Sequence, residues 1–229
     1  MADQTLAKFV NELRILTMLR LEGQATRADI ARRLKLTPAT ITRLIASLAE
    51  RGLVRDAQEA PRAGIAREPG RPGVSVALNS EGTYFLGVEI GVGSLRLALI
   101  DLCTDAVNTA EFRVSKTISP QEAVKSIADH LALLENDIRF RGKIRGLGVT
   151  VPGLVNSAGH IVHLPILGWR DVNLLALIKG AIDLPAFVEN NANAAAFGAV
   201  YTEHGIAGDC TIYFKLGTGC GGAAIVNGR

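Results

Sequence analysis

The chain has 229 residues, 48% of them hydrophobic, and a formal net charge of +3 at pH 7. This length allows one large domain or two smaller ones, each with enough material for a core. No apolar run is long enough to span a membrane, and the polar start lacks the apolar segment of a signal peptide. The chain has three widely spaced cysteines, Cys103, Cys210 and Cys220. Their odd number and wide spacing argue against a disulfide framework or a zinc knuckle and favour a reducing cytoplasm.

The charges divide the chain into two parts. Residues 1–79 hold 13 Lys and Arg against 8 Asp and Glu, a local net charge of +5. Residues 80–229 hold 12 against 14, a local net charge of −2. A small basic domain before a larger, nearly neutral one indicates that only residues 1–79 meet a polyanion. We therefore predict a nucleic-acid-binding domain over 1–79 and a second domain over 80–229.

Two helices are predicted at the start of the basic part. Over residues 5–21, apolar side chains recur on one helical face, namely Phe9, Leu13, Leu16 and Leu19. A capping-box pattern from Thr26 to Asp29 opens a second, short helix. Its outward Arg32 and Arg33 suit contacts with backbone phosphates. A tight turn then leads to a third helix, which is the order of a helix-turn-helix.

The third helix is the predicted recognition helix. Thr37 can cap it, a proline suits its first position, and Gly52 can end it with a left-handed residue. One apolar stripe faces inward, formed by Ile41, Leu44, Ile45 and Leu48. An amphipathic helix without DNA contacts is the plainer alternative. For the DNA-binding hypothesis, the predicted contacts are Thr37, Ala39, Thr40, Thr42, Arg43 and Ser47.

A β-wing is predicted to follow. A short strand over residues 53–55 can pair with a second one in which Val74, Val76 and Leu78 alternate. We interpret residues 57–67, between them, as a mobile linker. The Gly70–Gly73 segment, Gly-Arg-Pro-Gly, holds Arg71 extended, which suits insertion into a narrow A·T-rich minor groove.

Strands and helices alternate in the second part, which predicts an α/β domain. Predicted strands cover residues 86–90, 95–101, 107–114, 144–151, 186–188 and 211–216, and predicted helices cover 120–139, 173–182 and 194–201.

Polar and glycine-rich segments mark a candidate ligand site in this domain. Glu89 precedes a glycine turn. The N–H groups of the turn suit a phosphate, and the Glu89 carboxylate suits a metal. A plain β-hairpin is the simpler alternative. Gly153 turns the chain after a buried strand. Residues 189–193, Glu-Asn-Asn-Ala-Asn, lie between a strand and a helix, where open α/β folds bind ligands. Turn and cap asparagines are the alternative there.

Taken in order, these motifs resemble the winged-helix transcription regulators of the ROK family (repressors, uncharacterised reading frames and sugar kinases). The resemblance covers essentially the whole chain, and its most specific blocks are VENNANAAAFGA and LGTGCGGAAIVNGR. It implies an actin- and hexokinase-like (ribonuclease H-like) fold, incomplete here, with sugar and nucleotide bound between two α/β lobes. By the same resemblance, Gly153, Asn190 and Asn191 would bind the effector.

Departures from the kinase pattern predict that the chain has no catalytic residues. Val92 stands where the kinases of the family have a glycine in the phosphate turn, and Asn191 stands where they have the catalytic aspartate. The family zinc motif is absent, so we expect no metal, no cofactor, and either a fragment of a longer protein or a shortened sensor. The nucleotide site is expected to survive only in degenerate form, at Glu89, Gly91, Gly93, Gly217, Thr218 and Gly219.

The sequence thus predicts a cytoplasmic, sugar-responsive regulator, with repression the expected direction. Its expected partners are a double-stranded DNA operator, a small sugar or sugar derivative and a second copy of the chain, because one recognition helix makes too few base contacts. Two alternatives stay open: an ATP-using ROK sugar kinase, and a truncated DNA-binding protein whose sensor serves only in association.

Overall fold

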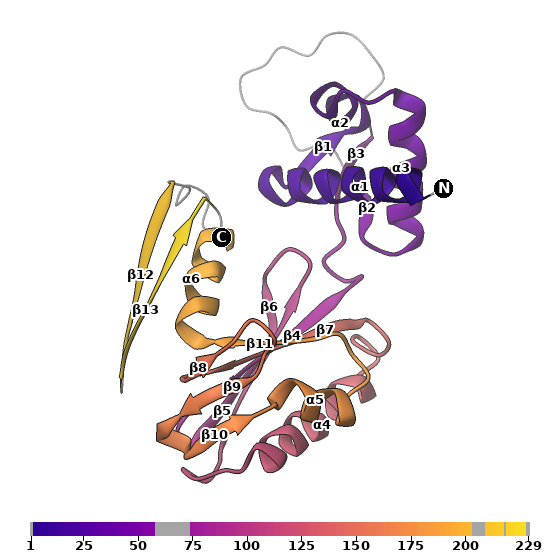
Figure 1. Ribbon diagram of the computed structural model, residues 1–229. Helices are drawn as coiled ribbons and strands as arrows, with labels where there is room; N and C mark the ends of the chain where they lie inside the picture. Colours follow the sequence, from indigo (N-terminus) through magenta and orange to yellow (C-terminus); the bar gives the residue numbers. More distant parts are fainter. Residues whose placement is uncertain (1, 58–73, 203–208, 218, 228–229) are drawn as a thin grey trace. The chain divides into compact units, whose positions relative to one another are not determined.

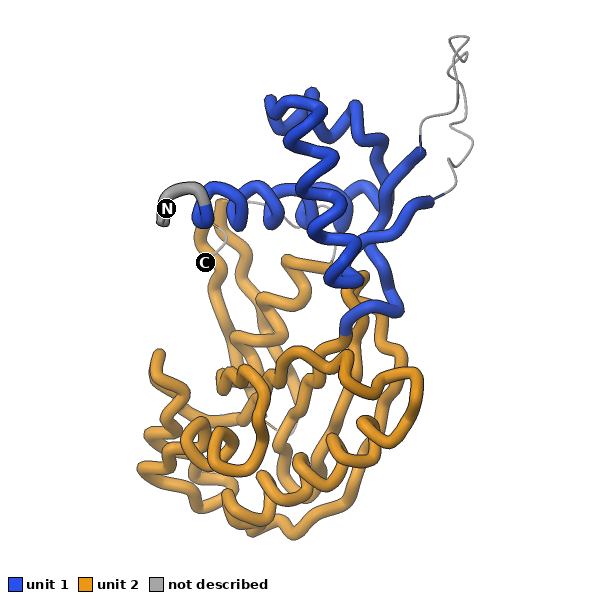
Figure 2. The backbone as a smooth tube through the Cα atoms, turned by 90° about the vertical axis from the view of Figure 1, so that its right-hand side faces the viewer, with its two compact units in different colours: residues 1–83 blue, residues 84–229 orange. Residues whose placement is uncertain are grey.

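The computed structural model describes residues 2–57, 74–202, 209–217 and 219–227 (Figure 1). The chain forms two compact units, Met1–Thr83 (unit 1) and Tyr84–Arg229 (unit 2), which Figure 2 colours separately. The boundary lies at 83/84, close to the 79/80 expected from charge. Among the described residues, no helix has both the length and the hydropathy to cross a membrane.

Unit 1 is a winged helix-turn-helix. Its elements are α1 (Ala2–Glu22), β1 (Gln24–Thr26), α2 (Arg27–Leu34), α3 (Pro38–Glu50), β2 (Val54–Ala57) and β3 (Ser75–Leu78). The predicted β2–β3 pairing is confirmed, and β1 adds a third strand that was not predicted. The predicted alternation in the second wing strand is wrong. All four residues of β3 are buried because it is the middle strand, whereas Val74, just outside it, is half exposed.

The buried face of α1 differs from the predicted one. Leu19 is fully buried as predicted and Leu16 is partly buried, but Phe9 and Leu13 are 55% and 46% exposed. The fully buried Ile15 was not predicted. The third buried position on this face is a carboxylate, Glu12, at 5% exposure. Apolar periodicity predicts that the more hydrophobic face of a helix is buried. It contains no information about a buried charge that hydrogen bonds from another helix stabilise.

Unit 2 is built on a mixed sheet. Its elements in order are β4 (Tyr84–Ile90), β5 (Ser94–Asp101), β6 (Ala106–Arg113), α4 (Pro120–Asn136), β7 (Ile144–Val151), β8 (Leu154–Val155), β9 (Ile161–Leu164), the 3-10 helix η1 (Pro165–Leu167), β10 (Trp169–Val172), α5 (Leu174–Ala181), β11 (Ala186–Asn190), α6 (Asn191–Thr202), β12 (Cys210–Leu216) and β13 (Cys220–Val226). The main sheet has the order β11-β7-β4-β5-β6, in which β11, β7 and β4 are parallel and β5 and β6 antiparallel. The predicted α/β fold is confirmed.

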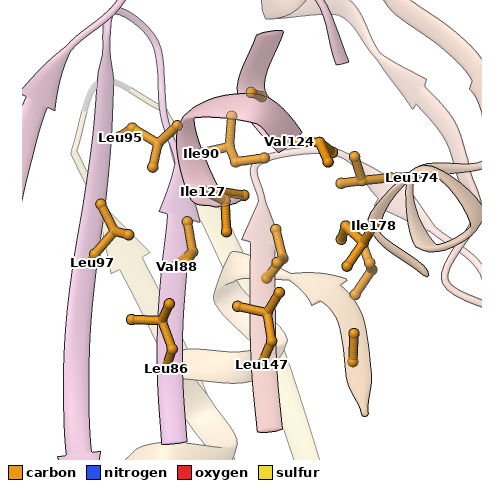
Figure 3. Packing of buried hydrophobic residues seen from close by; sticks show 14 of the residues in the cluster. Leu86, Val88, Ile90, Leu95, Leu97, Val124, Ile127, Leu147, Leu174 and Ile178 are labelled. Atoms are coloured by element: carbon orange, nitrogen blue, oxygen red, sulfur yellow. The ribbon is translucent and has the colours of Figure 1, made fainter. Parts of the chain in front are cut away.

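One face of this sheet makes the core of unit 2. Along β4, Leu86, Val88 and Ile90 point to the side where α4 and α5 pack, as Figure 3 shows. Ile127 of α4 and Ile178 of α5 are fully buried against that face. Because side chains alternate along a strand, Glu89 projects from the opposite face.

Core packing gives a first prediction. Replacing Ile127 with alanine should lower the free energy of unfolding by about 2–5 kcal/mol, because a fully buried side chain is lost and a cavity remains. Leu133 on the same helix is 65% exposed, so Leu133→Ala is the matched control and should change stability by about 0.5 kcal/mol or less. Urea denaturation followed by circular dichroism measures both. Equal losses would mean that α4 packs through another face.

Candidate functional site

The recognition helix α3 is built as the sequence predicts. The Thr37 hydroxyl accepts a hydrogen bond from the Thr40 amide at 3.3 Å, and Pro38 is at the first turn. Gly52 has a φ of +71° just after the helix, a left-handed conformation that favours glycine. The inward stripe is buried as predicted, at Ile41, Leu44, Ile45 and Leu48.

The outward side of α3 is polar along its first two turns. The Thr40 and Thr37 hydroxyls are hydrogen-bonded to each other at 2.9 Å. The Thr42 hydroxyl donates to the Pro38 carbonyl oxygen at 3.0 Å. Ala39 and Arg43 are exposed. Within the described part of the chain, Arg43 has no carboxylate partner. It therefore remains available for an external anion or a base edge.

The other predicted DNA contacts are placed differently. The Ser47 hydroxyl donates to the buried Glu12 carboxylate at 3.1 Å, so it stabilises the packing of α3 on α1. Arg32 and Arg33 form exposed ion pairs with Asp29 and Glu22. Such pairs contribute little to stability and can exchange for phosphate. Arg71 lies outside the described residues.

A cleft of about 970 Å³ lies in unit 2. It is bounded by the glycine turn after β4, the segment after β7, the start of α6 and the β12–β13 hairpin. Seven of the predicted site residues line it: Glu89, Gly91, Gly153, Asn190, Asn191, Gly217 and Gly219. Gly93 does not line it and instead turns the β4–β5 hairpin with a φ of +72°, while Thr218 is outside the described residues.

Glu89 is the electrostatic centre of this cleft. Its Oε1 accepts from Lys215 Nζ at 2.5 Å and from Asn191 Nδ2 at 3.1 Å. An Arg96 guanidinium nitrogen lies 3.5 Å from Oε2. Partial burial raises the pKa of Glu89, but the hydrogen bonds from Lys215 and Asn191 and the charges of Lys215 and Arg96 outweigh it, and the pKa lies below its ordinary value. The carboxylate is therefore ionised and paired.

Two of the predicted effector residues have structural tasks. Asn190 donates to the Gly153 carbonyl at 2.8 Å and accepts from the amides of Ala192 and Asn193, so its side-chain amide fixes the start of α6. A Cβ on Gly153 would come within 2.9 Å of the His163 carbonyl oxygen, so only glycine fits there. Asn191 differs, because its donor binds Glu89 and its oxygen has no hydrogen-bond partner among the described residues.

Three charged residues of these sites were not predicted from the sequence. Lys215 was the most accessible to prediction, because it is a lone charge in the apolar strand Cys210–Leu216 directly before the Gly-Thr-Gly turn. Arg96 is one of the outward-facing positions of β5, and no sequence motif includes it. Glu12 looks like an ordinary solvent-facing position on α1, so no local pattern marks it.

Together, unit 1 and unit 2 define a winged helix-turn-helix protein with an α/β unit of the actin and hexokinase type. The model of the ROK family matches residues 85–229, and that of the MarR family matches residues 10–58. The chain belongs to the ROK family. The predicted family and fold class are thereby confirmed.

Known relatives include both regulators and kinases. The xylose repressor of Bacillus subtilis is 28% identical over 99% of this chain and 58% of its own length. A glucokinase of Halalkalibacterium halodurans is 29% identical over 64% of this chain and 45% of its own length. A crystal structure of a ROK family transcriptional regulator, a homologue of the E. coli MLC protein, matches with a TM-score of 0.69 at 24% identity, over 90% of this chain and 51% of that one. The chain thus spans little more than half the length of the regulators it matches.

The Glu89 pairing predicts a pH effect. Because the folded-state pKa of Glu89 is depressed, its stabilising contribution is present above the unfolded-state pKa and disappears as the pH falls through the folded-state pKa. Lys215→Met should raise the pKa of Glu89 and shrink that contribution, as seen in a carboxyl ¹³C NMR titration. Lys179→Met, on the exposed side of α5, is the control. An unchanged Glu89 pKa in Lys215→Met would contradict the pairing.

Proposed function

We propose that this ROK family protein is a sugar-responsive, DNA-binding transcription regulator without kinase activity. It binds an operator through α3 of unit 1 and a small sugar in the cleft of unit 2. The observation that carries the proposal is the capped helix α3, which turns a polar face outward in a helix-turn-helix unit joined to a ROK domain.

The charge distribution supports DNA as the partner of unit 1. Residues 1–79 carry the local excess of five positive charges, and Arg43 extends from the first half of α3. Helix-turn-helix proteins place this part of the recognition helix in the major groove, and they gain specificity by presenting two copies to two half-sites. We therefore propose a homodimer on a two-fold symmetric operator, with repression as the direction, as in the xylose repressors among the relatives.

The cleft supports a polyhydroxylated ligand. Asn191 presents an amide oxygen that can accept a hydrogen bond from a hydroxyl group. Lys215 retains N–H groups beyond the one given to Glu89, and these can donate to a hydroxyl oxygen. Such mixed donors and acceptors at the wall of a cleft suit a sugar. The regulatory effect requires only that the ligand bind the two DNA-affinity states unequally.

The same groups argue against phosphoryl transfer. Proton removal from an attacking sugar hydroxyl needs a base, and the amide of Asn191 cannot accept that proton. Glu89 does not suit a divalent metal either, because one oxygen is bonded to Lys215 and Asn191 and the other faces Arg96. The relationship to a glucokinase keeps the kinase as the rival function.

DNA binding is tested with the whole chain. It should bind duplexes with an affinity that falls steeply as salt rises. Arg43→Met should weaken binding to a duplex selected from a random library by about 1–3 kcal/mol. Arg145→Met removes the same charge from an exposed position of unit 2 and should leave affinity unchanged. If the chain retained no duplex even at low salt, the proposal would fail.

Absence of kinase activity is tested with ATP and glucose, N-acetylglucosamine, N-acetylmannosamine or xylose. No phosphorylation is expected, since loss of a general base typically costs about 10²–10⁴-fold in rate. Asn191→Asp alone should not produce kinase activity, because Lys215 and Arg96 remain paired with the Glu89 carboxylate. Turnover by the unmodified chain that Asn191→Ala abolishes would establish the kinase instead.

A further inference from the structure

A buried carboxylate joins α1 to the recognition helix. Glu12 is 5% exposed, and it is the one buried charged side chain in the described part of unit 1. Ser47 Oγ donates to its Oε1 at 3.1 Å, and an Arg51 guanidinium nitrogen donates to its Oε2 at 2.8 Å. Lys8, one turn earlier on α1, stays 3.7 Å from Oε1 and is half exposed. Both oxygens are thus held by the far end of α3.

These bonds constrain α3 in a way that its apolar contacts do not. Ile15 and Leu19 of α1 and Leu48 of α3 are fully buried, but apolar contacts are non-directional and tolerate small sliding or rotation. The two hydrogen bonds have narrow distance and angle ranges. A shift of α3 along or about its axis would leave a charged group unpaired inside the protein, which is strongly unfavourable.

The position of the anchor separates two tasks along one helix. Thr40 and Arg43 lie in the first two turns of α3, where the recognition face is exposed. Ser47 and the C-cap residue Arg51 lie in the last turns, where the helix is attached to α1. Arg43 and Ser47 are four residues apart, about 6 Å along the axis. Fixing the second half of so short a helix therefore fixes the direction in which Arg43 points.

We propose that Glu12 is a positioning residue for DNA recognition, which sets the axial position and rotation of α3. This inference rests on the proposed DNA-binding function. Loss of the anchor should reduce discrimination between DNA sequences more than affinity for DNA in general. Base contacts require side chains to be placed accurately, whereas phosphate contacts come from flexible arginines and tolerate small movements of the helix.

The test uses the whole chain and two probes: a duplex selected from a random library with the unmodified protein, and a random-sequence duplex of equal length. For Glu12→Leu, the ratio of the two affinities should fall by about tenfold, the discrimination supplied by one good base contact. Affinity for the random-sequence duplex should change less than about twofold. Lys8→Met, which removes only the long, exposed ion pair, is the control and should leave the ratio unchanged.

A conservative variant separates positioning from stability. Glu12→Gln keeps an oxygen that accepts from Arg51 and should recover most of the ratio. If Glu12 served stability alone, Glu12→Leu would weaken binding to both duplexes in parallel with the folded fraction measured by urea denaturation, and the ratio would stay constant. That result would overturn the inference while leaving the proposed DNA-binding function intact.

Two further outcomes are decisive. If Glu12→Leu does not fold, the double variant Ser47→Ala with Arg51→Met removes the donors from α3 and leaves α1 unchanged, and its affinity ratio decides the question by the same criterion. If the unmodified chain selects no duplex from the library, the proposed function fails, and the inference about Glu12 fails with it.

Discussion

The alternation of side chains along β4 governs the arrangement of unit 2. Leu86, Val88 and Ile90 must face α4 and α5 to complete the core, and this places Glu89 on the other face of the sheet. Because β4 is the central strand, between β7 and β5, its outward carboxylate lies where neighbouring elements can reach it. Asn191 arrives from the start of α6 and Lys215 from β12. The same alternation thus produces both the core and the charged centre of the cleft.

Each unit holds a carboxylate through partners distant in the sequence, buried in unit 1 and partly buried in unit 2. Glu12 receives Ser47 and Arg51, and Glu89 receives Lys215 across 126 residues of chain. A buried charge without partners would be strongly destabilising, so the arrangement around Glu12 tolerates few alternatives. Apolar packing in each unit decides which faces meet. The paired carboxylates then select one relative position of the elements.

Local patterns were sufficient for much of the fold. The cap at Thr37, the left-handed Gly52 and the buried stripe of α3 each depend on residues within one helix, and all three were predicted. The failures have a common cause. Strand β1 depends on pairing with a strand some 50 residues away, and the inward turn of Glu12 depends on α3. Patterns of hydrophobicity describe one element at a time, so they are silent about charges that only a second element can satisfy.

The proposed function would separate ligand binding from catalysis within the cleft of unit 2. Gly153 has no room for a Cβ, and Asn190 is committed to the start of α6, so both maintain the shape of the wall. Asn191 is isosteric with aspartate and can hold a hydroxyl, but it cannot take its proton. Lys215 places a positive charge on the Glu89 carboxylate. Under the proposed function, such a cleft would recognise a sugar and release it unchanged, as an effector site requires.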